Sequence, residues 1–141
     1  MTNPETIART YLDSVATKDL DRCASLLAPE VTFRGPASQY KGAAEILAAF
    51  RRLSSIHVRT DIQRVFSDGN EVCVIYDFVT DTMGAMPTIE WLTIEDGKIA
   101  SIKLFYDQVP WVKIREEMAR RAAAAAAPSA AVAASSSKAR A

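Results

Sequence analysis

The sequence predicts an α+β fold in which helices and a curved sheet enclose a mostly apolar pocket, followed by a disordered tail. Apolar residues recur at helical spacing before about residue 53, and from residue 58 onward they alternate with a period of two. The composition then changes, because 12 of the 20 residues from 122 to 141 are alanine. We therefore divide the chain into one domain at residues 1–121 and an Ala/Ser-rich disordered tail at residues 122–141.

Three helices are expected in the first part of the domain. Asn3 followed by Pro4 is typical of a helix start, since asparagine caps free amides and proline fits the first helical position. Asp19 should cap a second, short helix, and Pro29 ends it because proline has no amide hydrogen to donate. A third helix is expected at residues 42–53, where apolar side chains gather on one side.

Strands are expected after the second helix and again after the third. A short strand at residues 31–34 is broken by Gly35 and Pro36. Longer strands with an alternating pattern are expected at residues 58–66, 71–80, 88–94 and 99–107. Asp68-Gly69 and the segment 95–98 suit tight hairpin turns, so the long strands should form one antiparallel meander.

A last helix should run from Trp111 to about Arg121. The alanines that follow could prolong it, because alanine is the best helix former. Pro128 and the serines at 135–137 then end that tendency. Residues 128–141 are therefore expected to be unstructured.

The composition excludes several classes of protein. The chain has 17 basic and 17 acidic residues and is 49% hydrophobic, as an ordinary globular protein is. Its basic residues form no cluster able to displace counterions from phosphates, so no nucleic-acid partner is expected. No apolar run approaches the ~18 residues that span a bilayer, and the first residues lack the pattern of a signal peptide. We expect a cytoplasmic protein without membrane contact.

No metal or cofactor is expected. Cys23 and Cys73 lie far apart in a chain without an export signal, so a disulfide between them is not expected. Two cysteines and His57, the single histidine, cannot complete a tetrahedral zinc site. His57 itself is expected at the surface. The sequence also has no glycine-rich phosphate loop.

The strand register decides which side chains face the pocket. If the connection between the second and third long strands is symmetric about Met83-Gly84, Asp77 lies directly opposite Glu90. Two carboxyls this close in an apolar pocket repel each other, so one should stay protonated near neutrality. The same reasoning for the other hairpins gives an inner face that is mostly apolar. Its expected members are Thr60, Ile62, Cys73, Ile75, Asp77, Thr88, Glu90, Leu92, Ile102, Leu104 and Tyr106.

The opposite face of the sheet is expected to carry Val74, Tyr76, Phe78, Ile89 and Trp91. An apolar sheet face that no helix covers is typical of a subunit interface. The sequence therefore predicts a homodimer through the outer sheet face.

Five short segments carry a resemblance to a known family. They are residues 8–12 (ARTYL), 19–21 (DLD), 27–31 (LAPEV), 95–99 (EDGKI) and 105–107 (FYD). Their order, with the predicted elements over about residues 4–112, resembles the nuclear transport factor 2-like superfamily, which includes ketosteroid isomerase and SnoaL-like polyketide cyclases. The resemblance implies a cone-shaped, curved antiparallel sheet wrapped by the three N-terminal helices around a pocket, and frequent dimerisation through the sheet's outer face.

Carried onto this sequence, the resemblance implies roles for individual residues. The oxyanion-hole tyrosine of ketosteroid isomerase corresponds to Tyr11, and its second, protonated acidic donor corresponds to Glu90. The general base of that enzyme corresponds to Gly35, which cannot move a proton. We therefore expect Asp77 to be the substitute base, beside Glu90 and Tyr11 as the other candidate catalytic residues. The expected substrate-binding residues are Phe33, Phe50, Ile62, Cys73, Ile75, Leu92, Ile102, Leu104 and Tyr106.

These residues favour a cofactor-independent acid–base enzyme, an isomerase, cyclase, dehydratase or hydrolase, acting on a small apolar organic molecule. Two other interpretations stay open, namely a non-catalytic protein that binds such a ligand and a dimeric scaffold domain whose cavity is incidental. Asp77 could instead be a structural carboxylate, and Tyr11 a core tyrosine with a satisfied hydroxyl. The inward acid pair favours the enzyme, because a binder of neutral ligands gains nothing from two competing carboxyls.

Overall fold

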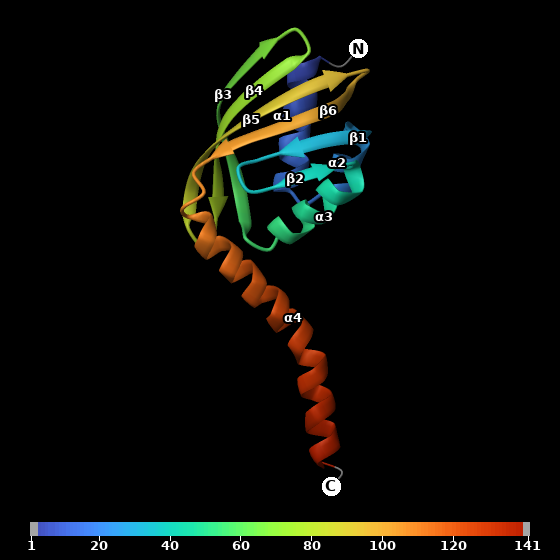
Figure 1. Ribbon diagram of the computed structural model, residues 1–141, viewed down its shortest axis with the longest axis vertical. Coiled ribbons are helices and arrows are strands. Elements are labelled where there is room, and N and C mark those ends of the chain that lie inside the picture. The colour runs from blue at the N-terminus through green and yellow to red at the C-terminus, as the bar shows by residue number, and fades with distance from the viewer. Residues whose placement is uncertain (1–2, 140–141) are drawn as a thin grey trace.

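The computed structural model describes the backbone of residues 3–139 and the side chains of residues 3–126. Figure 1 shows a curved sheet with helices packed against it and a last helix that leads away from it. The helices are α1 (Pro4–Ala16), α2 (Leu20–Leu26), α3 (Ala43–Leu53) and α4 (Trp111–Ala139). The strands are β1 (Leu27–Arg34), β2 (Gln39–Lys41), β3 (His57–Asp68), β4 (Glu71–Thr80), β5 (Gly84–Glu95) and β6 (Lys98–Tyr106). The predicted α+β fold with a curved sheet is confirmed.

The strands form one sheet in the order β2-β1-β6-β5-β4-β3. The strands from β3 to β6 form the expected antiparallel meander. β1 instead runs parallel to β6, and β2, which the sequence analysis did not predict, pairs antiparallel with β1. The sheet is therefore mixed, with one parallel pair beside the expected antiparallel pairs. The chain between β1 and β6 passes through α3 and the whole meander, and a connection of that length permits parallel pairing.

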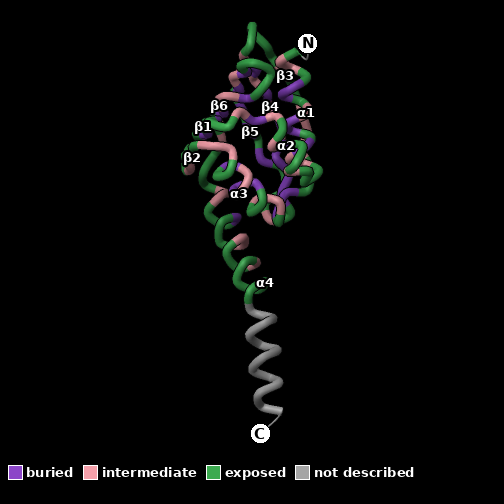
Figure 2. Tube along the Cα trace, turned by 90° about the vertical axis from the view of Figure 1, so that its right-hand side faces the viewer, coloured by how far each residue is buried: buried purple, intermediate pink, exposed green. Residues whose placement is uncertain are grey.

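The first three helices cover one side of the sheet. The predicted caps of α1 and α2 are present: Oδ1 of Asn3 accepts a hydrogen bond from the Thr6 amide at 2.7 Å, and Oδ1 of Asp19 accepts one from the Arg22 amide at 3.2 Å. α1 packs against β3 and β4, and α3 packs against β1. Figure 2 shows that the buried positions lie inside the body formed by these helices and the sheet. The core therefore lies between the two layers.

The last helix is longer than the sequence predicted. α4 continues to Ala139, whereas we expected the helix to end near Arg121. The high helix propensity of alanine explains the continuation into the alanine-rich segment. Ile114, which is fully buried, fixes the start of α4 to the domain. The boundary between a domain and a separate tail at residue 122 stays a prediction.

The pairing of β4 with β5 differs from the predicted register. Pro87 rather than Glu90 lies opposite Asp77, a shift of three residues, and Glu90 lies opposite Val74. Because side chains alternate between the two faces of a strand, a shift by an odd number exchanges the faces. Asp77 and Glu90 therefore lie on opposite sides of the sheet, and the predicted inward acid pair was wrong.

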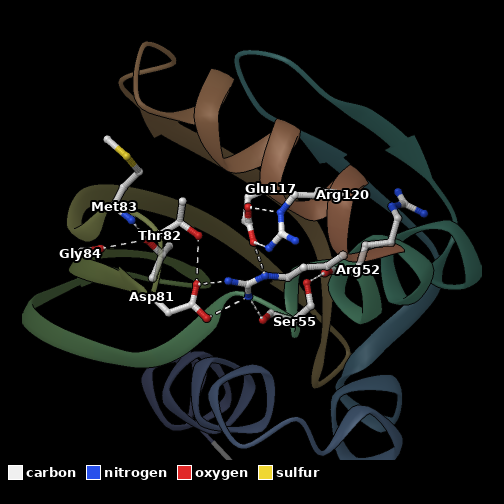
Figure 3. Close-up of polar contacts among 10 residues, drawn as sticks. Arg52, Ser55, Asp81, Thr82, Met83, Gly84, Glu117 and Arg120 are labelled. Atoms are coloured by element: carbon white, nitrogen blue, oxygen red, sulfur yellow. Dashed lines mark hydrogen bonds and ion pairs between the residues drawn. The ribbon is translucent and has the colours of Figure 1, made fainter. Parts of the chain in front are cut away.

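The turn between these strands explains the shift. The hydroxyl of Thr80 accepts a hydrogen bond from the Met83 amide at 2.9 Å and donates one to the carbonyl of Gly84 at 3.3 Å (Figure 3). Thr80 also pairs with Gly84 at the end of the ladder. The turn is therefore centred nearer to Thr82 than to the Met83-Gly84 pair on which the prediction relied.

The exchange of faces applies to all of β4. Val74, Tyr76 and Phe78, expected on the outer face, are buried on the inner face. Cys73 and Ile75 share the outer side with Asp77. In the hairpin of β5 and β6, Thr88 lies opposite Tyr106, Glu90 opposite Leu104 and Leu92 opposite Ile102, so these six residues share the face on which they were expected. In β3, Thr60 pairs with Phe78 and lies on the inner face, where it was expected.

Arg121 joins α4 to two loops of the domain. Figure 3 labels its partners Asp81, Ser55 and Glu117. Its guanidinium donates to both carboxylate oxygens of Asp81 at 2.9 and 3.0 Å and to the backbone carbonyl of Ser55 at 2.6 Å. It also donates to Glu117 at 2.8 Å within α4. Hydrogen bonds from Arg120 and Arg121 lower the pKa of Glu117 to about 2, so the cluster keeps its charges down to strongly acidic pH.

We predict that Arg121→Gln lowers the unfolding temperature by several degrees, whereas Arg120→Gln leaves it nearly unchanged. The first variant removes bonds that join α4 to Asp81 and Ser55, while the bonds of Arg120 go to Glu117 in its own helix. Thermal unfolding at low and high salt measures both effects. Equal shifts for the two variants would contradict the structural role given to Arg121.

Candidate functional site

A cavity lies between the inner face of the sheet, α1, α3 and the start of α4. Its volume is about 50 Å³, room for a few water molecules, and its wall is mostly apolar and aromatic. The predicted site residues that line it are Tyr11, Phe33, Phe50, Glu90, Leu104 and Tyr106. Ile62, Leu92 and Ile102 lie on the same face of the sheet but belong to the core beside the cavity.

A buried acid lies in the cavity wall. Glu90 projects inward from β5 and is only 2% exposed. Its Oε1 accepts a hydrogen bond from the hydroxyl of Tyr11 on α1 at 2.6 Å, and its Oε2 accepts one from the hydroxyl of Tyr76 on β4 at 2.7 Å. Tyr76 pairs with the residue two positions before Glu90, which places the two side chains diagonally on one face. Both carboxyl oxygens are thus held by phenols.

Burial controls the protonation of this cluster. Burial raises the pKa of Glu90, and the hydrogen bonds from Tyr11 and Tyr76 oppose that change. Burial also raises the pKa of both tyrosines well above the usual value, and the negative charge of Glu90 adds to this effect. Both tyrosines therefore remain protonated donors. Neither lysine nor arginine is among the side chains described in the cavity wall. The cluster can therefore hold a proton on Glu90 more readily than an exposed carboxyl would.

His57 also lines the cavity, although the sequence predicted it at the surface. It is 4% exposed, its Nε2 lies 2.9 Å from Oγ1 of Thr60, and its ring stacks on Phe78 with centroids 4.2 Å apart. Burial lowers the pKa of His57, so the ring is neutral at neutral pH. A β-bulge directly after His57 turns its side chain inward, and the alternating pattern of the sequence did not reveal it.

Two rows of aromatic rings form much of the wall. One row comes from α1, α3 and the short strands; its members are Tyr11, Phe50, Phe33 and Tyr40, with neighbouring centroids 5.6 to 6.1 Å apart. The other comes from the meander and α4; its members are His57, Phe78, Trp111 and Tyr106, with neighbouring centroids 4.2 to 5.9 Å apart. Such walls favour a flat, mostly apolar ligand, for which aromatic contacts add to the free energy of burial.

Three predicted site residues lie away from the cavity. Asp77, Cys73 and Ile75 occupy the outer side of β4, and Cys73 borders a shallow depression there together with Trp91 and Phe105. The structure therefore gives Asp77 no contact with the cavity. Tyr76, which the prediction placed outside, takes the position beside Glu90.

Gly35, directly after β1, faces the same cavity wall. A Cβ at this position would lie 3.6 Å from Tyr106, 3.7 Å from Leu104 and 3.8 Å from Phe33, which are ordinary contact distances. These neighbours line the cavity, so a Cβ at residue 35 would fit in contact with residues of the cavity wall.

In the part of the chain that the structure describes, no group of three or more His, Cys, Asp and Glu side chains could hold a metal ion. None of the described helices is long and apolar enough to cross a membrane.

Comparison with known proteins identifies the family. A model described as a SnoaL-like domain matches residues 8–102. The chain belongs to the SnoaL-like domain family. No curated protein matches the sequence. The SnoaL-like resemblance seen in the sequence is thus confirmed.

Solved structures show the same fold as this SnoaL-like chain. A nuclear transport factor 2-like protein from Cytophaga hutchinsonii has 18% identity and a TM-score of 0.71, over 79% of this chain and 96% of that one. A protein from Kribbella flavida, named provisionally as a ketosteroid isomerase, has 20% identity and a TM-score of 0.66, over 74% and 77%. A protein from Sinorhizobium meliloti, named provisionally as a polyketide cyclase, has 20% identity and a TM-score of 0.65, over 70% and 92%. At these identities the likeness shows the fold alone.

We predict that Glu90→Gln removes a pH-dependent loss of stability. Burial raises the pKa of Glu90, so between its usual value of 4.5 and the raised value the folded state holds a proton that the unfolded chain has lost. The stability of the wild type therefore falls as the pH rises through this window, and the glutamine variant should lack that fall.

Unfolding temperatures from pH 4 to 8 test the prediction. The difference between Glu90→Gln and the wild type should grow with pH. Tyr76→Phe removes a donor that lowers the pKa of Glu90, so in that variant the fall should extend to higher pH. Parallel curves for all three proteins would contradict the assignment.

Proposed function

We propose that this SnoaL-like protein is a cofactor-independent acid–base enzyme that moves a proton on a small, mostly apolar carbonyl compound. The observation that carries the proposal is the buried carboxyl of Glu90, which lines an apolar cavity and is held by two phenols. Burying a carboxyl without a cation is costly, and a well-packed apolar residue would serve stability at least as well. Buried carboxyls with a raised pKa are typical of groups that exchange protons with a substrate.

Glu90 would act as the base. Its carboxylate removes a proton from the carbon next to the carbonyl group, and the electrons of the broken C–H bond move to the carbonyl oxygen. The proton is then returned from Glu90 to a different atom of the substrate, which completes an isomerisation, or sets up elimination or ring closure. The raised pKa strengthens the base without requiring a second reactant.

The two tyrosines would respond to the transfer. In the resting state Tyr11 and Tyr76 donate to the carboxylate of Glu90. Once Glu90 has taken up a proton, it is a weaker acceptor, and a phenol hydrogen can instead stabilise the negative oxygen of the enolate. The role that the resemblance implied for Tyr11 is compatible with this arrangement, with Tyr76 as an additional donor.

The second candidate function is ligand binding without catalysis. Gly35 favours it, because this position corresponds to the general base of ketosteroid isomerase and here has no side chain. Glu90 distinguishes the two functions, because binding of a neutral ligand does not require a proton-accepting group.

The proposal retains the homodimer and the cytoplasmic location predicted from the sequence. Phe66, Ile89, Trp91 and Phe105 expose apolar surface on the outer face of the sheet, between 37% and 58% of each residue. Contact between two copies would bury this surface and leave the cavities on the inner faces.

We predict that the protein exchanges the methyl protons of acetophenone for deuterium in heavy water and that Glu90→Gln lowers this rate about 100-fold or more, the usual contribution of a general base. Proton NMR follows the loss of the methyl signal. Asp77→Asn is the matched control, because it also replaces one acid by its amide but lies outside the cavity, and it should keep the wild-type rate. Equal rates for the wild type and Glu90→Gln, with acetophenone bound, would favour the binding function.

We predict that Gly35→Asp increases the same exchange rate at least tenfold. The structure leaves ordinary contact distances around a Cβ at this position, and the neighbours of that Cβ line the cavity, so we expect the new carboxylate to act on a ligand there. Gly35→Asn is the control for shape, since it differs only in lacking a base. If the two variants have equal rates, a carboxylate at residue 35 does not remove a proton from the reacting carbon.

A further inference from the structure

A second compartment adjoins the cavity at the surface. We name it the mouth; it has a volume of about 190 Å³. The cavity and the mouth share the wall formed by Phe33, Phe50, Leu53, Leu104, Tyr106 and Trp111. Beyond this shared wall the mouth is bounded by Ser38, Tyr40, Ala49, Arg52, Arg115 and Met118. A ligand larger than the cavity would therefore extend into the mouth.

The mouth carries positive charge. Arg52 lies in the last turn of α3, and Arg115 lies near the start of α4. Both line the mouth, and no aspartate or glutamate is among the side chains described there. The mouth thus has the opposite charge to Glu90, the acid in the cavity.

Neither arginine is used in an ion pair within the described part of the chain. Five arginines of the domain have carboxylate partners, as Arg121 has in Asp81 and Arg120 has in Glu117. Neither Arg52 nor Arg115 has a carboxylate within 4.0 Å among the described side chains. In Figure 3 the side chain of Arg52 extends away from the cluster around Arg121. Both guanidinium groups are therefore available to a ligand.

The charge of Arg115 acts on the wall that the two compartments share. Burial raises the pKa of Tyr106, and the positive charge of Arg115 opposes that change. Because Tyr106 borders both compartments, Arg115 lies close enough to interact with a ligand that fills them.

We infer that the ligand of this site is an apolar carbonyl compound that carries a carboxylate at one end, and that Arg52 and Arg115 bind this carboxylate in the mouth. Arginine presents several donors in a fixed plane and binds carboxylates more strongly than a neutral donor does. Glu90 repels a carboxylate in the cavity, and the arginines attract it in the mouth. These two effects together fix the orientation of the ligand. The reacting carbonyl end then lies beside Glu90. The inference rests on the proposed function for the chemistry at that inner end.

The test compares two ligands that differ in charge at one end. 4-Acetylbenzoate has a methyl ketone opposite a carboxylate, and methyl 4-acetylbenzoate has a neutral ester there. Isothermal titration calorimetry should show at least tenfold tighter binding of the acid, and 0.5 M sodium chloride should reduce that preference because the mouth is open to solvent. Arg52→Gln and Arg115→Gln should each lower the affinity for the acid about threefold to tenfold and leave the affinity for the ester unchanged.

Arg51→Gln is the matched control. Arg51 is the neighbour of Arg52 in α3. It borders a groove along α4 that Arg52 and Arg115 also border, but it does not line the mouth. Its replacement removes the same charge and should leave the preference for the acid intact. An equal loss in Arg51→Gln would show a general electrostatic effect and would overturn the inference.

The outcomes separate this inference from the proposed function. If both ligands bind equally and their acetyl protons exchange through Glu90, the carboxylate site is wrong and the proposed enzyme stands. If the acid is preferred through Arg52 and Arg115 but neither ligand exchanges protons, the carboxylate site stands and catalysis by Glu90 fails. Absence of binding for both ligands overturns both proposals.

Discussion

The site depends on one buried interaction, the contact of the Glu90 carboxyl with the hydroxyls of Tyr11 and Tyr76. It joins α1 to β4 and β5, so the helical layer and the sheet meet at a polar group inside the core. The phenols donate hydrogen bonds to both oxygens of the carboxyl. They carry no positive charge that would neutralise a carboxylate, so Glu90 stays basic. A cation in their place would lower the pKa of Glu90 and leave an inert ion pair. Stability alone does not explain this choice of residues.

The elements of the fold could be predicted because their signals are local. Asn3 and Asp19 cap α1 and α2 as their positions in the sequence indicated, and turn residues separate the four strands of the meander. The parallel pairing of β1 with β6 joins segments far apart in the chain, and no local pattern specifies it. β2 has three residues, too few to show an alternating pattern.

The site was predicted only in part, because one turn determined the faces of β4. Both sets of alternating positions in this strand are apolar, so periodicity could not decide which set faces inward. Asp77 itself could have indicated which face of β4 points outward. A single charge in an apolar strand more often marks the solvent side, since a buried charge needs a partner. That reading would have placed Tyr76 inside, beside Glu90, whose own position followed from the correctly predicted hairpin with β6.

The positions of the charged groups explain how one pocket could bind an anion and still use a carboxylate as a base. Arginine beside Glu90 would pair with it and remove its basicity. Arg52 and Arg115 lie in the mouth instead, where water screens them from Glu90 but where they can meet a ligand's acid group directly. The aromatic rows between the two regions keep the intervening space apolar. In the function that we propose, separation of the charges between the cavity and the mouth would preserve the chemistry at the inner end and would give selectivity at the outer end.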